Sequence, residues 1–318
     1  MGNRISIRPL AVFAITALMC GIVSANAHAQ TNSSSHVGTT SANFLKMGVG
    51  ARASALGGAF VAIADDATAG YWNAAGLVQI PTTEITFMHN DWYLDIKSEY
   101  LGAAFPVSRT LAFGLGISYL DYGSFDGYDS KDQPTGSYSA NAMVVSSSGS
   151  IRLTDQVSFG VTGKFFSEEL DQSSANGYAV DVGALYVTGA FSLGLNVTNL
   201  GAGLRHDTEE FPLPSSVTAG LALNLYDGRL RIASDLSKPQ DNAFAIHQGV
   251  EYCYENTVFL RTGYSHDFSG TDLGGSTGMA LGLGVRHSFG SIDYSYLPDE
   301  QIGDVHRISL RLQFGKTR

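Results

Sequence analysis

The chain has 318 residues, of which 44% are hydrophobic and only 15% charged, with 37 glycines, 17 phenylalanines and 15 tyrosines. This hydrophobic share excludes a disordered chain, and a mean hydropathy of +0.04 excludes a bundle of membrane-spanning helices. The net charge of −10 argues against a nucleic-acid-binding protein, which needs a basic surface. Two cysteines are too few for a disulfide scaffold or a cysteine-ligated metal site.

Residues 1–29 have the pattern of a secretory signal peptide. Arg4 and Arg8 precede an apolar stretch over residues 10–23, and Ala27-His28-Ala29 offers a small-x-small cleavage pattern. The alternative, a membrane anchor, is disfavoured because the apolar stretch is too short to span a bilayer. We therefore expect export and cleavage near Ala29. Residues 30–43 are small and polar and predict a flexible leader.

Residues 44–80 are rich in alanine and glycine and compatible with short helices. Asp65 is a plausible N-cap for a helix over residues 66–72, and Asn73 for the turn that follows.

After Pro81 the pattern changes to a strict two-residue alternation. In the clearest case, Leu111 to Tyr119, large apolar residues alternate with Gly, Ala or Ser. This period indicates β-strands with two very different faces. About fourteen such segments lie between Thr83 and Phe314.

The connections between these segments alternate in length. Tight turns are expected near residues 107–110, 154–156, 188–190, 227–228, 255–256 and 289–290. Longer polar loops are expected near 90–97, 121–137, 167–176, 200–214, 237–243, 266–277 and 298–305. Short turns on one end and long loops on the other are typical of an up-and-down transmembrane β-barrel. We predict an all-β protein, an antiparallel barrel of about fourteen strands over residues 81–318. A secreted β-sandwich or solenoid is the alternative, disfavoured because the second face is small rather than charged.

The same alternation predicts which side chains face the lumen. The expected lumenal charged or titratable residues are Lys164, Asp181, Arg231, Asp235, His247, Glu251, Arg261, Arg286, Asp293, Arg307 and Arg311. We hypothesise that residues 44–80 fold into the barrel as a plug. They would pack on small lumenal residues (Gly114, Gly116, Gly160 and Gly282), with Asp65 and Asp66 paired to arginines such as Arg286 or Arg311.

The N-terminal motif is long and distinctive. It reads FLKMGVGARASALGGAFVA from Phe44, followed by Asp65-Asp66 and by YWNAAGL from Tyr71. This strongly resembles the signature of the PorV/PorQ family within the FadL-like outer-membrane proteins, although Ala74 stands where that family usually has proline. The residues that carry the resemblance are Gly50, Arg52, Gly57, Gly58, Asp65, Asp66, Trp72, Asn73 and Gly76.

The resemblance implies a barrel in the outer-membrane lipid with an N-terminal hatch of short helices. PorV-like members imply a role in type IX secretion and surface attachment, with secreted proteins and other secretion components as partners. The alternative is FadL-like passive transport of long-chain fatty acids and other hydrophobic compounds. Such transport would use a lateral opening at an interrupted strand, for which glycine-rich stretches near Gly149 or Gly201 are candidates.

No residue pattern indicates catalysis or a bound cofactor. His247 and Glu251 share a strand face but stand roughly 13 Å apart, too far for a direct dyad. Gly48-Val49-Gly50 lacks the Lys-Ser/Thr of a phosphate-binding loop, and the spacing of Asp126, Asp129 and Asp132 does not match a calcium loop. We expect no enzyme, no cofactor, no metal site and no nucleic-acid partner.

Overall fold

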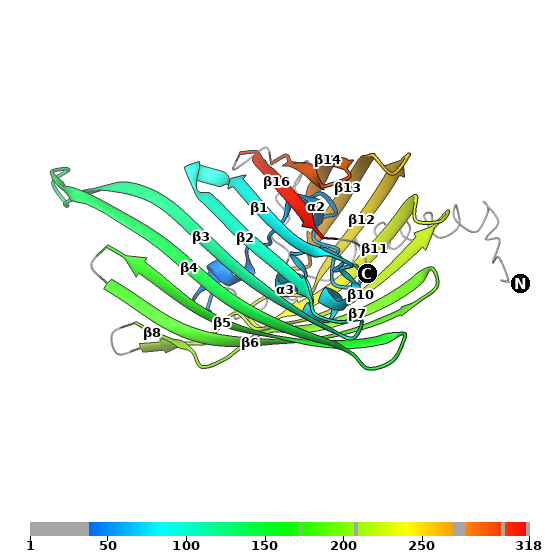
Figure 1. The fold of residues 1–318 in the computed structure, drawn as a ribbon. Helices are drawn as coiled ribbons and strands as arrows, with labels where there is room; N and C mark the ends of the chain where they lie inside the picture. Colours follow the sequence, from blue (N-terminus) through cyan, green and yellow to red (C-terminus); the bar gives the residue numbers. More distant parts are fainter. Residues whose placement is uncertain (1–37, 172, 207–208, 270–277, 300–302, 316–318) are drawn as a thin grey trace, which may run out of the picture. The chain divides into compact units, whose positions relative to one another are not determined.

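A closed ring of fourteen antiparallel strands dominates the computed structural model, which describes residues 38–171, 173–206, 209–269, 278–299 and 303–315 (Figure 1). Each strand pairs with its neighbour along the chain, and β1 pairs with β16 to close the ring. The predicted barrel is confirmed. The predicted signal peptide, residues 1–29, and leader residues 30–37 lie outside the described residues.

The ring strands are β1 Thr83–Asp91, β2 Lys97–Pro106, β3 Leu111–Tyr128, β4 Pro134–Arg152, β5 Val157–Leu170, β6 Ser173–Thr188, β7 Phe191–Leu200, β10 Ser216–Leu225, β11 Leu230–Pro239, β12 Ala245–Tyr254, β13 Val258–Asp267, β14 Met279–His287, β15 Gly290–Leu297 and β16 Val305–Phe314. A two-stranded ribbon, β8 Leu204–His206 with β9 Glu209–Phe211, occupies the loop after β7. A short 3-10 turn, η4 Tyr93–Asp95, connects β1 to β2.

The two faces of the ring differ as the alternation predicts. On β3, Phe113, Leu115 and Ile117 are 48%, 55% and 42% exposed, whereas Ala112 on the opposite face is 1% exposed. Rows of exposed Leu, Ile, Val and Phe around a ring with no free edge are suited to hydrocarbon rather than water. The outward face is therefore the membrane-facing surface, and the buried face lines the lumen.

The predicted loops near 121–137 and 167–176 are wrong, because the strands continue through most of both ranges. β3 extends to Tyr128 and β4 begins at Pro134, with a bulge between Asp121 and Ser124. Near Asp121 the alternation of large apolar and small residues ends. Backbone hydrogen bonding between strands does not require this alternation, so the pairing continues into polar sequence. Figure 1 shows the resulting β3–β4 hairpin reaching well beyond its neighbours.

The segment before β1 lies inside the ring (Figure 1). It contains η2 Asn43–Lys46, α2 Ala51–Ala55, α3 Ala69–Trp72 and η3 Ala74–Gln79. We call residues 44–80 the plug. Many of its alanines are almost fully enclosed, including Ala51, Ala55, Ala59 and Ala69 at 0% exposure. Among the described residues, no helix combines the length and apolarity needed to cross a bilayer.

One predicted cap is wrong and the other is confirmed. The helix begins at Ala69 rather than Asp66, and the carboxylate of Asp66, not Asp65, accepts a hydrogen bond from the Thr68 N–H (3.0 Å). The Asp65 carboxylate instead pairs with Arg52 and Arg231. The Asn73 side chain accepts from the Ala75 N–H (3.1 Å) and caps η3.

Lumenal glycines let the plug approach the wall at backbone distance. A Cβ added at Gly263 would lie 2.1 Å from the Gly57 nitrogen, and one at Gly160 2.3 Å from the Ala74 carbonyl carbon. Gly114 and Gly282 also contact the plug, through Leu77 and Ala55. Gly116 lies instead against Tyr100 and Ser146 of the wall, so its expected contact with the plug is wrong.

We predict that Gly263→Val destabilises the protein by on the order of 1–3 kcal/mol or more, because its side chain would displace plug backbone. The matched control is Gly163→Val, since a Cβ at Gly163 meets no atom within 4 Å and valine favours strands. Urea unfolding of both variants in detergent, followed by circular dichroism, measures the difference. Equal unfolding free energies would contradict close packing of the plug on the wall.

Candidate functional site

The plug and the residues just before it are attached to the barrel near both ends of the lumen. At the long-loop end, the Ser41 N–H donates to the Pro212 carbonyl (3.0 Å), and Asp241 accepts hydrogen bonds from Thr40 Oγ1 (2.5 Å) and Lys46 Nζ (2.7 Å). At the short-turn end, Arg152 Nη2 donates to the Val78 carbonyl (2.8 Å). The plug therefore runs along the lumen from the loops toward the turns.

The loop residue Asp241 has a lowered pKa. Burial alone would raise the pKa of this carboxyl, but the hydrogen bonds from Lys46 and Thr40 and the Lys46 charge outweigh it. A lowered folded-state pKa contributes stability above the unfolded-state value of about 3.9, and that contribution is lost as pH falls through the folded-state value. This attachment consequently persists at neutral pH and weakens only in acid.

The plug side chain Arg52 is held by three carboxylates. Its Nε and Nη2 donate to Glu251 of β12 at 2.9 and 3.1 Å, while Nη1 donates to Asp65 (2.6 Å) and Asp66 (3.1 Å) of the plug. The Arg52 side chain is only 8% exposed. A buried bidentate pair of this kind fixes position as well as charge.

Wall arginines complete this charge cluster. Arg231 Nη1 lies 2.8 Å from Asp65, and Arg261 joins Glu251 (2.6 Å) to Asp293 (2.7 Å). Arg311 Nη1 lies 3.9 Å from Asp66, so of the two predicted partners of the plug aspartates only Arg311 is close. Arg286 has no ion pair among the described residues and lies 4.4 Å from the centre of the Phe259 ring.

The other signature residues shape the plug. Gly50, Gly57 and Gly58 have φ values of 87°, 66° and 85°, which glycine adopts without strain. A Cβ at Gly76 would lie 2.0 Å from the Ala64 carbonyl oxygen. Trp72 Nε1 donates to the Val49 carbonyl (2.9 Å) and so joins two parts of the plug.

Several wall contacts to the plug were not predicted. Asp235 Oδ2 accepts from the Phe60 and Val61 N–H groups, both at 2.8 Å, and Glu84 Oε1 accepts from the Ala67 N–H (2.7 Å). His247 Nδ1 lies 2.9 Å from the Gly57 carbonyl oxygen. The two-residue alternation predicts that Asp235 and His247 face the lumen. It cannot predict their partners, because these are backbone groups, which every residue carries.

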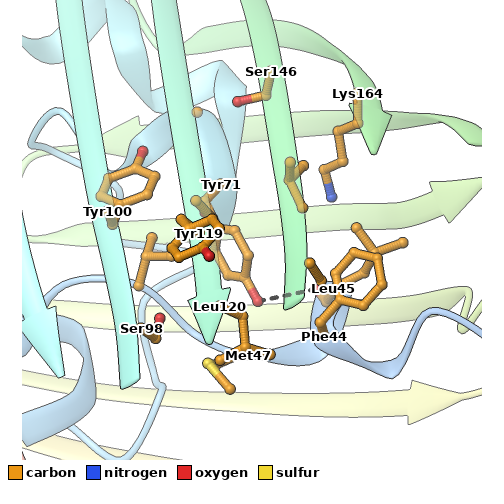
Figure 2. Close-up of a pocket in the computed structure, with 15 residues that line it drawn as sticks. Phe44, Leu45, Met47, Tyr71, Ser98, Tyr100, Tyr119, Leu120, Ser146 and Lys164 are labelled. Atoms are coloured by element: carbon orange, nitrogen blue, oxygen red, sulfur yellow. Dashed lines mark hydrogen bonds between the residues drawn. The ribbon is translucent and has the colours of Figure 1, made fainter. Parts of the chain in front are cut away.

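A pocket lies between the N-terminal part of the plug and the wall formed by β2 to β5 (Figure 2). It holds about 570 Å³ between its lining atoms, solvent at its mouth included. The plug contributes Phe44, Leu45, Met47, Val49, Gly70 and Tyr71, and the wall contributes Ser98, Tyr100, Ser118, Tyr119, Leu120, Ala142, Val144, Ser146 and Lys164. Predicted lumenal residue Lys164 is thus a pocket residue, paired with Asp181 at 2.7 Å.

The strand interruption predicted at Gly149 is wrong, because Gly149 pairs regularly with Phe113 and with Val161. Near Gly201 the ladder is irregular. β7 ends at Leu200, the β6–β7 register shifts between Val180 and Val182, and Asn199 has φ +58°.

Part of the sequence matches a known family model, and the fold resembles that of known channels. Residues 17–165 match the model of UPF0164, an uncharacterised protein family, and no curated protein matches the sequence. The CymD monoaromatic hydrocarbon channel is 13% identical, with a TM-score of 0.64 over 85% of this chain and 99% of that one. The toluene transporter TbuX of Ralstonia pickettii is 16% identical, with a TM-score of 0.59 over 84% and 99%. The toluene transporter TodX of P. putida is 14% identical, with a TM-score of 0.60 over 85% and 99%.

The chain has the barrel fold of these channels, and residues 17–165 match the UPF0164 model. At the level of the fold, the FadL-like resemblance predicted from the N-terminal motif is confirmed. At these identities the likeness to solved structures concerns the fold alone. The matched family segment spans the plug and the first strands, which supply every lining residue of the pocket.

We predict that Arg52→Ala loosens the plug, because it leaves carboxylates of the charge cluster without their shared cation, at a cost of about 3 kcal/mol. Ion conductance in planar lipid bilayers should rise above that of the unaltered protein. Arg109→Ala, at an exposed turn residue, is the control and should leave conductance unchanged. Identical conductance in both variants would show that the charge cluster does not hold the plug.

Proposed function

We propose that the protein carries small hydrophobic molecules passively across the bacterial outer membrane. The supporting observation is the pocket where the plug meets the wall, lined by the apolar residues Phe44, Leu45 and Met47 of the plug and Leu120 of the wall. Each buried CH₂ group of a ligand contributes about 0.8 kcal/mol toward transfer out of water. An apolar molecule arriving from the long-loop side therefore gains free energy on reaching this pocket.

Further passage requires the plug to move. Beyond the pocket, plug backbone lies against lumenal glycines and the charge cluster binds Arg52 to the wall. The long-loop end of the plug is attached by the few polar contacts to Asp241 and Pro212. Displacement of this end, rather than of the charge cluster, is the smaller change and opens the pocket inward.

The kinds of protein that share this fold support transport over catalysis. CymD, TbuX and TodX are named as hydrocarbon channels or toluene transporters, which suggests a non-enzyme. Among the described residues, no group of three or more His, Cys, Asp or Glu side chains is arranged to hold a metal ion.

Filling the pocket should stop transport without harming the barrel. Val144→Trp places a large ring in the pocket, and its neighbour Val145, 41% exposed on the membrane-facing side, supplies the control Val145→Trp. We expect uptake of radiolabelled toluene into cells making the protein to fall at least fivefold for the first variant only. Unchanged uptake by Val144→Trp would contradict the proposed route.

A second candidate function, in type IX secretion and surface attachment, follows from the narrower likeness to PorV and PorQ. The supporting observation is the β3–β4 hairpin, which extends beyond the rest of the wall and exposes Phe125, Tyr128 and Tyr138 (54%, 59% and 43%). Exposed aromatic side chains are frequent anchors in protein–protein interfaces. This surface would contact secreted proteins or other secretion components.

The two functions use different parts of the molecule and are separable. If the secretion proposal is right, removing residues 122–138 strands specific secreted proteins in the periplasm while toluene uptake continues. Proteomics of periplasm and medium measures this, with the Val144→Trp variant as a control that blocks only the pocket. Normal secretion after the deletion would refute the secretion role.

A further inference from the structure

The pocket is not uniformly apolar, because the wall places a set of hydroxyl groups in it. Tyr100 of β2 pairs in register with Ser118 of β3, and Ser146 of β4 pairs with Gly116 one step toward the short-turn end. Ser98 adds a fourth hydroxyl on β2. Opposite them lie the apolar side chains of η2, so the pocket has an apolar side and a hydroxyl-bearing side (Figure 2).

Three of these hydroxyls have no hydrogen-bond partner among the described residues. They belong to Tyr100, Ser98 and Ser118, of which Tyr100 and Ser98 are only 6% and 5% exposed. Ser146 by contrast donates to the Gly116 carbonyl (3.3 Å), and Tyr71 donates to the Leu45 carbonyl (3.3 Å). None of the three oxygen atoms is fully enclosed, so they face open space in the pocket and are available to hydrogen-bond with a ligand that enters it.

The Tyr100 side chain occupies the space that side chains at its glycine neighbours would otherwise fill. A Cβ at Gly102 would lie 2.8 Å from the Tyr100 hydroxyl oxygen, and one at Gly116 3.3 Å from it. The Tyr100 ring therefore lies along the wall, where larger residues at these positions would obstruct it. Its hydroxyl is held at the pocket surface on β2 and β3.

The cation in the pocket is already neutralised. Lys164 Nζ lies 2.7 Å from Asp181 Oδ2 and donates to Asn199 Oδ1 (2.9 Å), and both charged side chains are at most 5% exposed. A ligand carboxylate would find no uncompensated positive charge here and would lose its hydration on burial. The pocket is thus polar but electrically balanced.

We propose that the pocket selects neutral amphipathic molecules, of the class of phenols and other small alcohols, over plain hydrocarbons and over carboxylates of the same size. This rests on the proposed transport function and specifies its ligand class. The hydrocarbon part of the ligand packs on Phe44, Leu45 and Leu120, and its hydroxyl exchanges hydrogen bonds with Tyr100 and Ser118.

A matched ligand series tests the proposal. Isothermal titration calorimetry on the full-length mature protein in detergent would compare 4-methylphenol, toluene and 4-methylbenzoate, which share one ring and one methyl group. We expect 4-methylphenol to bind at least tenfold more tightly than either of the others, since a site that offers hydrogen bonds disfavours the analogue lacking them. Tyr100→Phe should weaken 4-methylphenol about fivefold and leave toluene unchanged.

Controls keep the outcomes distinct. Tyr178→Phe, at a tyrosine 71% exposed on the outer face of β6, should change no affinity, and Ser118→Ala provides a second variant if Tyr100→Phe fails to fold. Equal or tighter binding of toluene would overturn the ligand class while leaving the transport function intact. Tightest binding of 4-methylbenzoate would overturn it as well, by showing that Lys164 is available. Absence of binding by all three compounds would refute the pocket and the transport function together.

Discussion

The hydrogen-bond requirement of the backbone in hydrocarbon determines the rest of this structure. A lipid-exposed strand cannot leave an N–H or C=O group unpaired, so the sheet must close on itself. Pairing of β1 with β16, from Thr83 with Phe314 to Asp91 with His306, removes the last edge. Closure then leaves a lumen, and every lumenal feature, from the glycine rows to the buried charges, depends on what fills that space.

The plug fills the lumen by two complementary means. Glycines such as Gly160 and Gly263 bring wall and plug backbones into contact, which gives close packing but little specificity of position. The charge cluster around Arg52 supplies that specificity, because its guanidinium satisfies Glu251, Asp65 and Asp66 only in one placement. The pocket lies beyond both the glycine contacts and the charge cluster, between η2 and the wall from β2 to β5.

Much of the fold, but less of the site, is predictable from the sequence. The two-residue alternation gives the strands and their inward faces, since side-chain parity is a local property. Strand ends beyond Asp121 were missed because polar pairs outside the membrane carry no contrast between faces. The partners of Asp65 and Asp66 were only partly predicted, since Arg52 and Arg231 are as suitable chemically as Arg286. The pocket is not predictable from the sequence, because it combines β2 to β5 with residues 44–49 and Tyr71, which are far apart in the chain.

Spin labelling along β5 tests most directly whether one face meets lipid and the other a filled lumen. Nitroxides attached singly at residues 157–159 and 161–165, after Cys253→Ser, would be examined in bilayers for collision with oxygen and with a water-soluble nickel complex. The structure predicts high oxygen accessibility at odd-numbered positions, and low accessibility to both probes at 158, 162 and 164, whose side of the strand is buried. Strong nickel accessibility at those even positions would mean an open, water-filled lumen and would contradict the account.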